Sequence, residues 1–262
     1  MKHKISKNLF IILVFFFLYL PILVLVVFSF NTSKMNIVFE GFTLKWYQTL
    51  LKNRSLLEAF GNTLIVSFVS TTVSTIIGTL SAYALRKYQF FGKKLIVKLL
   101  YIPIVIPEIV LGISLLSVYT LFQLDLGLGT LILSHIAFSI PYVIISVKSV
   151  LDQLNPQLED SAKDLGASPF RVFWNVTLPN LIPGITSGAM LAFTLSLDDV
   201  VISYFTAGPG SNTLPLKIYS MIKTGITPDV NALSTIILII TLSILMFVTL
   251  KQVKRLRKEV QV

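Results

Sequence analysis

Six stretches of about 20 mostly apolar residues constrain this chain more than any other feature. An α-helix needs about 20 apolar residues to cross the hydrocarbon core of a bilayer. Only 13% of the residues are charged, against roughly 25% in an average soluble domain. The sequence therefore predicts an all-α integral membrane protein in which residues 1–262 form a single membrane domain. The predicted spans are residues 9–30, 60–85, 99–124, 130–150, 181–205 and 230–250.

The distribution of Lys and Arg predicts which side of the membrane each loop faces. Six spans put both termini on the same side, and cytoplasmic segments carry an excess of basic residues. With a cytoplasmic N-terminus, 16 of the 22 Lys and Arg residues fall inside. We therefore predict that both termini are cytoplasmic. The net charge of +10 then reflects membrane topology and does not indicate nucleic-acid binding.

Several kinds of chemistry are excluded by residues that the chain lacks. It has no Cys and two His residues, His3 and His135, which excludes disulfides and Cys- or His-cluster metal sites. The one Gly-Lys pair, Gly92-Lys93, lacks the spacing of a phosphate-binding loop. Energy for transport must then come from a partner or from an ion gradient. For His135, in the middle of a span, we expect packing or an interhelical hydrogen bond.

The segment 152–180, between the fourth and fifth spans, carries the start signal of a short helix. Asn155 is a favoured N-cap residue, and Pro156 fits the first helical position. Gly166 fits the end of this helix, where a left-handed backbone conformation is common. The pattern predicts a helix between residues 156 and 166 that stands outside the membrane.

A second start signal follows at Ser168 and Pro169. It predicts a second short helix that ends near residue 177, before Pro179. The two helices form a hairpin, which is longer than a simple connection between spans requires. A cap on the bundle and a docking element for another protein both remain possible from these residues alone. One side of the hairpin is apolar through Leu158, Leu165, Phe170, Phe173 and Val176.

This hairpin resembles the "EAA" loop of permease subunits of ABC importers, in the binding-protein-dependent (MetI-like) family. The matching residues are Asp160-Ser161-Ala162, then Gly166, then Val176-Thr177-Leu178-Pro179. Asp160-Ser161 departs from the usual Glu-Ala, and Glu159 is adjacent, so either acid can take that position. The resemblance implies a cytoplasmic coupling loop that seats on an ATPase subunit. It implies coupling roles for Glu159, Asp160, Ala162, Gly166, Ala167, Pro169, Leu178 and Pro179.

The resemblance extends to permeases of spermidine/putrescine importers. It is carried by residues 41–47, 134–138, 195–201 and 214–221. It implies transport by alternating access, in a complex with a second permease subunit, two ATPase subunits and an extracytoplasmic polyamine-binding protein. ATP and Mg²⁺ would bind to the ATPase, with no cofactor on this chain. The implied location is the bacterial inner membrane, where the chain contacts lipid as a multi-pass protein.

Three acidic residues lie within the predicted spans, where an ionised side chain costs at least about 2.5–3.5 kcal/mol and marks a functional site by default. They are Glu108, Asp198 and Asp199. A polyamine is a chain of ammonium groups, which carboxylates and aromatic faces can bind. We therefore predict that these acids line the substrate pathway, together with Tyr101 and Tyr204.

Each acid also has a structural alternative. Glu108 follows Pro107 and can open a helix segment, where an acid suits the positive end of the helix dipole. Asp198 and Asp199 point about 100° apart if they share one helix. One of them then faces the pathway while the other bonds a neighbouring helix, with a slight preference for Asp198 on the pathway.

Two external contacts and two competing functions complete the prediction. An amphipathic helix with Phe42, Trp46 and Tyr47 is expected in the outer headgroup zone. The Gly- and Pro-rich loop 208–229 is a better candidate than this helix to meet an external binding protein.

A gradient-driven secondary transporter or channel is the main alternative to an ATP-driven importer. A membrane enzyme lacks any supporting motif.

Overall fold

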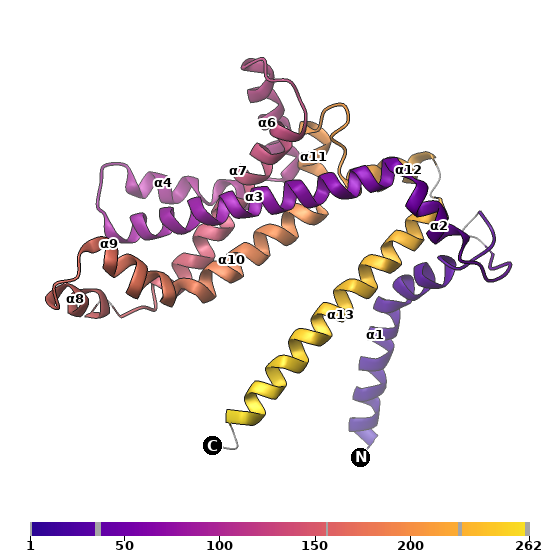
Figure 1. The fold of residues 1–262 in the computed structure, drawn as a ribbon, viewed down its shortest axis with the longest axis horizontal. Coiled ribbons are helices and arrows are strands. Elements are labelled where there is room, and N and C mark those ends of the chain that lie inside the picture. Colours follow the sequence, from indigo (N-terminus) through magenta and orange to yellow (C-terminus); the bar gives the residue numbers. More distant parts are fainter. Residues whose placement is uncertain (1, 35–37, 156, 225–226, 260–262) are drawn as a thin grey trace. The chain divides into compact units, whose positions relative to one another are not determined.

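A computed structural model describes residues 2–34, 38–155, 157–224 and 227–259. These residues form helices and connecting turns, with one isolated bridge between Asn31 and Phe42 and no β-strand among them. The chain divides into two compact units (Figure 1), which we describe separately. Unit 1 comprises residues 1–57 and 220–262, and unit 2 comprises residues 58–219.

Unit 1 is built from α1 (Lys2–Phe28), α2 (Lys45–Lys52) and α13 (Pro228–Glu259). Both α1 and α2 contact α13. The apolar part of α1, Leu9–Phe28, has no buried residue, so it offers its surface to lipid or to another subunit. In Figure 1 the first turn of α1 and the last turn of α13 lie at the same end of this unit.

Polar contacts tie the residues that follow α1 to helix α2. The indole N–H of Trp46 donates to the Asn31 carbonyl at 2.5 Å, and Tyr47 shares a 2.9 Å hydrogen bond with Ser29. The amphipathic helix predicted here is present as α2. However, Trp46 is only 7% exposed, so its ring packs inside unit 1 and does not face the headgroup zone as predicted. Phe42 remains exposed and stacks on Phe30.

Unit 2 has α7 at its centre. The core residues Val143, Ile144, Val147 and Leu151 come from this helix, and Ala82, Leu181 and Ala192 from its neighbours. Two helices cross the division between the units, α3 near its start and α12 near its middle. The helices are α3 (Arg54–Lys87), α4 (Lys93–Leu99), α5 (Ile102–Val105), α6 (Glu108–Leu121), α7 (Leu128–Leu151), α8 (Gln157–Asp164), α9 (Pro169–Val172), a π-helical turn (Phe173–Thr177), α10 (Leu178–Asp198), α11 (Val201–Thr206) and α12 (Leu214–Thr224).

Several helices are long and apolar enough to span a membrane, as the sequence predicted. Among the described residues there are four: Leu9–Phe28, Arg54–Lys87, Leu128–Leu151 and Pro169–Asp198. A bent pair, Lys93–Val105 with Glu108–Leu121, supplies a fifth if it is one span. The sixth predicted run, residues 230–250, is helical within α13, in which Pro228–Ser243 is apolar.

The third predicted span, residues 99–124, is not one helix. Its two parts meet at an angle of 112°. The break lies at Ile106 and Pro107, both of which are extended. A residue before proline is held away from the helical region by the proline ring, so the chain leaves α5 there and starts again at Glu108. This confirms that Glu108 opens a helix segment.

Two other boundaries differ from the prediction. The second hairpin helix does not stop before Pro179, because α9 continues through the π-helical turn into α10. In this wider turn the Leu178 N–H donates to the Phe173 carbonyl, which lets the chain pass into Pro179 without a break. The predicted loop 208–229 contains helix α12, whose first N–H, on Leu214, donates to the Thr63 hydroxyl at 2.7 Å.

Helices α7 and α10 approach closely because α10 carries glycine at two positions four residues apart. A Cβ on Gly188 would lie 3.1 Å from Val143 Cα, and a Cβ on Gly184 would lie 3.2 Å from Val147 Cα. This Gly-x-x-x-Gly spacing is a known means of close helix packing in membranes. It was visible in the sequence, and the sequence analysis missed it.

Candidate functional site

The first helix of the hairpin begins and ends as its sequence predicts. The side-chain oxygen of Asn155 accepts a hydrogen bond from the Gln157 N–H at 3.0 Å at the start of α8. Pro156 lies outside the described residues. At the other end, Gly166 has a φ of +84°, and the Ala167 N–H donates to the Ala162 carbonyl at 3.1 Å. This is a Schellman motif, in which the left-handed glycine turns the chain out of the helix.

The second helix starts at Ser168, whose hydroxyl accepts from the Arg171 N–H at 3.5 Å. It is tied to α8 across the hairpin by a hydrogen bond of 2.8 Å from the Thr177 hydroxyl to the Glu159 carboxylate. Asp160 instead faces solvent and pairs with Lys163 at 2.8 Å, an interaction that raises the pKa of the Lys163 ammonium. Of the two adjacent acids, Glu159 is the one that closes the hairpin.

The hairpin exposes several large apolar side chains. Leu165 is 89% exposed and Phe170 is 71% exposed, and Leu158 and Trp174 are also exposed. Several exposed apolar side chains in one short hairpin, beside the charged residues Asp160 and Lys163, are typical of a protein-docking face. Phe173, in contrast, packs on the Tyr83 ring, with centroids 4.8 Å apart. We name the exposed apolar residues Leu158, Leu165, Phe170 and Trp174 the candidate docking face.

The base of the hairpin is fixed to the membrane helices by Arg86, near the end of α3. Its guanidinium donates to the carbonyls of Leu151, the last residue of α7, and Leu154, the latter at 3.0 Å. The Leu151 carbonyl belongs to the last turn of α7, where carbonyls lack an N–H partner within the helix, and it also accepts from the Leu154 N–H at 3.2 Å. The contact joins the end of α3 to the point where the chain leaves α7 for the hairpin.

The two adjacent aspartates do not share one helix, contrary to the prediction for residues 181–205. Helix α10 ends at Asp198, and Asp199 is extended, with φ −62° and ψ 130°. The Asp199 carboxylate accepts from the N–H groups of Ile202 at 3.1 Å and Ser203 at 2.8 Å, and so caps the start of α11. Aspartate favours such caps because its oxygens bond the free N–H groups of the first turn. Asp198 is exposed and Asp199 is buried.

A buried polar network holds this break in place. His135 of α7 is fully buried, with Nδ1 at 2.7 Å from the Ser196 hydroxyl and Nε2 at 3.2 Å from the Ser203 hydroxyl. Its Nε2 is also 3.5 Å from the Asp199 carboxylate, and Ser70 of α3 extends the network at 3.2 Å from Ser196. The expected interhelical hydrogen bond of His135 is confirmed. The serines were missed, because their residue type alone does not distinguish a network from simple helix packing.

The other predicted pathway residues lie on exposed surface of unit 2. Glu108 starts α6 and is exposed. Tyr101 and Tyr204 are both exposed. No hydrogen bond or ion pair joins Glu108, Asp198 or the two tyrosines to one another in the part of the chain that the structure describes. Helix α6 does pack on α11, the helix that follows Asp198.

Comparison with known proteins places these features in a family. Residues 74–260 match a family described as "Binding-protein-dependent transport system inner membrane component". The chain is 43% identical over 242 residues to "Spermidine/putrescine transport system permease protein PotC" of Escherichia coli (strain K12), which covers 92% of each chain. It is 39% identical to "Putrescine transport system permease protein PotI" of the same organism, covering 87% of this chain and 84% of that relative.

Solved structures show the same fold. A bacterial ABC transporter involved in the import of the acidic polysaccharide alginate contains a chain with a TM-score of 0.72 and 14% identity, covering 95% of both chains. The MetNI methionine ABC transporter, in an inward-facing conformation, contains one with a TM-score of 0.56 and 17% identity, covering 79% of this chain and 95% of that one.

Proposed function

Because this chain belongs to the family of binding-protein-dependent transport system inner membrane components, we propose that it is the membrane-spanning permease subunit of an ATP-driven polyamine importer. The observation that carries the proposal is the 43% identity to a spermidine/putrescine permease over 92% of the chain. The chain is a transport subunit and not an enzyme. ATP and Mg²⁺ bind to a separate ATPase, and this chain binds no cofactor.

In this proposal residues 1–262 form one permease domain with six spans and both termini in the cytoplasm of a bacterial cell, in the inner membrane. The excess of basic residues in the segments assigned to the cytoplasm supports this orientation. The first turn of α1 and the last turn of α13 lie at the same end of unit 1, and this also supports the orientation (Figure 1). The partners are a PotB-like second permease, two PotA-like ATPase subunits and an extracytoplasmic PotD-like polyamine-binding protein.

The hairpin 152–180 is the cytoplasmic coupling element. Its docking face at Leu158, Leu165, Phe170 and Trp174 seats on the ATPase, and Glu159 keeps α8 and α9 at a fixed angle through Thr177. Because α10 continues the hairpin without a break and packs closely on α7, a push on the hairpin moves these two helices together. Asp199, which caps α11, lies where the movement of α10 is passed on to α11. This movement of α7, α10 and α11 would open the pathway to one side of the membrane and then to the other, which is alternating access.

The substrate pathway is lined by the exposed acids Glu108 and Asp198 and by the rings of Tyr101 and Tyr204. Exposed carboxylates can exchange water for the ammonium groups of a polyamine. Asp199 contributes to the pathway indirectly, since its oxygens are occupied by Ile202 and Ser203 and hold α11 in place. The loop around Gly208 and helix α12 is the part proposed to meet the binding protein.

Reconstitution tests this function directly. Proteoliposomes that contain this chain, its second permease, the ATPase and the binding protein are expected to take up radiolabelled putrescine or spermidine only when ATP is supplied. Liposomes that contain this chain alone, under an imposed ion gradient, are expected to take up neither. Uptake by the chain alone would instead favour a gradient-driven transporter and overturn the proposal.

We expect Asp198→Asn and Glu108→Gln each to lower the initial rate of polyamine uptake by about tenfold or more, since a hydrogen bond to a charged group contributes about 1.5–3 kcal/mol. Neither change should alter thermal stability, because both side chains are exposed. The matched control is Asp199→Ala, which removes a buried cap and should lower the melting temperature in detergent. Normal uptake by both Asp198→Asn and Glu108→Gln would show that the acids do not line the pathway.

A further inference from the structure

Residues 88–98, which include most of α4, are rich in lysines and aromatic rings. Lys93, Lys94 and Lys98 lie on or beside one face of α4, and Tyr88 and Phe91 are exposed just before it. No ion pair joins any of the three lysines to a carboxylate within the described ranges. Exposed aromatic rings beside lysines are typical of a segment that lies in the headgroup zone of a membrane.

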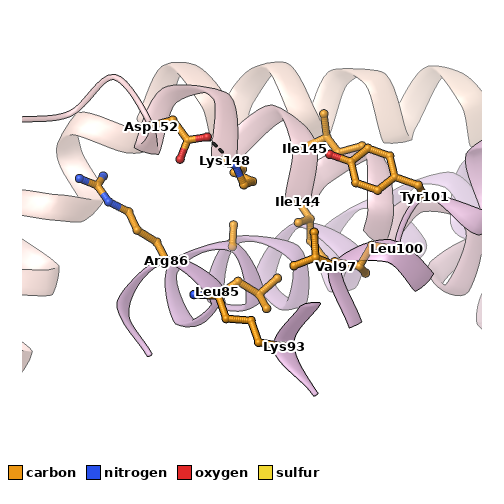
Figure 2. A pocket seen from close by; sticks show the side chains of 11 residues that line it. Leu85, Arg86, Lys93, Val97, Leu100, Tyr101, Ile144, Ile145, Lys148 and Asp152 are labelled. Atoms are coloured by element: carbon orange, nitrogen blue, oxygen red, sulfur yellow. Dashed lines mark hydrogen bonds and ion pairs between the residues drawn. The ribbon is translucent and has the colours of Figure 1, made fainter. Parts of the chain in front are cut away.

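An apolar cavity opens beside this segment, between the ends of α3, α4 and α7 (Figure 2). It holds about 270 Å³ and is walled by Leu85, Val97, Leu100 and Ile144, among others. In Figure 2 the charged groups of Arg86, Lys148 and Asp152 lie toward one side of it, and Tyr101 lies at the opposite side. The cavity is therefore apolar in its interior and polar at its edge.

The charges at the edge of the cavity are not equally available. Arg86 already donates to the carbonyls of Leu151 and Leu154, and Lys148 is paired with Asp152. Lys93 of α4 donates to the Tyr88 carbonyl at 3.1 Å, but none of the three lysines Lys93, Lys94 and Lys98 pairs with a carboxylate among the described residues. A second hollow, of about 580 Å³, is lined by Lys93, Lys94 and Lys98 and shares Lys93 and Val97 with the apolar cavity. The apolar cavity thus adjoins a hollow that is lined in part by three lysines without a carboxylate partner in the described chain.

We propose that an anionic phospholipid binds here, with its phosphate among Lys93, Lys94 and Lys98 and part of one acyl chain in the cavity walled by Leu85, Val97 and Ile144. Charge complementarity identifies the headgroup, since three lysines lack an acidic partner in the described chain. The adjoining apolar cavity favours a lipid over free phosphate, which has no apolar part to fill it. The site lies beside Arg86 at the base of the coupling hairpin.

The charge requirement is tested with the purified full-length chain by native mass spectrometry. With an equimolar mixture of phosphatidylglycerol and phosphatidylcholine, the wild-type chain is expected to retain phosphatidylglycerol. The triple variant Lys93→Gln, Lys94→Gln, Lys98→Gln should lose this preference by between about tenfold and a hundredfold. The matched control neutralises three exposed lysines of unit 1, Lys34, Lys45 and Lys52, and should keep the preference. Equal retention of both lipids by the wild type, or an unchanged preference in the α4 variant, would overturn the proposal.

The acyl-chain requirement is tested at Val97. Val97→Trp fills the cavity and should weaken phosphatidylglycerol retention, while glycerol phosphate, which has the headgroup charge without acyl chains, should not compete in the wild type. A photoactivatable amino acid at position 97 in the assembled transporter should give a phospholipid adduct. Full competition by glycerol phosphate would indicate a free phosphate site, and a protein adduct would indicate that a subunit covers the cavity. Either result contradicts a bound lipid.

Discussion

Replacement of Gly166 by valine is expected to abolish polyamine uptake while the chain still reaches the membrane. Gly166 has a φ of +84°, a conformation that costs a β-branched residue about 1–3 kcal/mol. A Cβ at this position would meet no atom within 4 Å, so the variant produces backbone strain without a clash. The strain should release the Schellman motif and let the docking face lose its shape. Uptake assays and a pull-down of the ATPase measure the two consequences.

The control for this prediction uses the same position. Gly166→Asn should keep most of the uptake, because asparagine adopts the left-handed conformation more readily than other residues with a side chain. Both variants should reach the membrane in equal amounts, since position 166 lies outside the packed helices. The coupling assignment would be wrong if the valine variant retained the ATPase and transported at the wild-type rate.

Replacement of Gly188 by leucine is expected to prevent stable assembly of unit 2. A Cβ there would already lie 3.1 Å from Val143 Cα and 3.2 Å from Ser146 Cβ, and leucine adds three more carbons. The helices α7 and α10 must then separate, which also disturbs the core around Val143 and Val147. We expect the free energy of unfolding to fall by about 3 kcal/mol or more. Thermal unfolding in detergent and the yield of purified chain measure this loss.

A glycine in a helix of the same unit provides the comparison. A Cβ on Gly61 of α3 would meet nothing within 4 Å. Gly61→Leu should therefore leave the melting temperature unchanged or raise it, since leucine favours the helix by almost 1 kcal/mol over glycine. If both leucine variants lowered the melting temperature equally, the close approach of α7 and α10 would not be the cause.

The hairpin was predicted well because its boundaries depend on neighbouring residues. The caps at Asn155 and Ser168 and the turn at Gly166 each involve contacts within a few positions along the chain. Local chemistry of this kind can be read from sequence. The end of the second helix was predicted wrongly, because Pro179 normally indicates a boundary and here follows a π-helical turn that accommodates it.

The site in the membrane was predicted less completely. The acids Glu108, Asp198 and Asp199 were identified as unusual, but their roles differ. Asp199 is buried as a cap because Ser203 and His135 surround it, and His135 comes from a helix more than 60 residues away in the chain. The cap on Ser203 is local and could have been read from the sequence, but no spacing rule relates Asp199 to His135, so the burial of Asp199 could not be predicted.

The sequence by itself determined that this chain is an all-α membrane protein, where its helical hairpin lies, and to which family it is similar. These properties follow from apolar length, local caps and motif spacing, which need no contact between distant residues. Only the tertiary structure decided that α10 breaks after Asp198, that Trp46 is buried, and that lysines of α4 adjoin an apolar cavity. Each of these depends on which helices meet, and side chains of similar polarity become buried or exposed according to that packing.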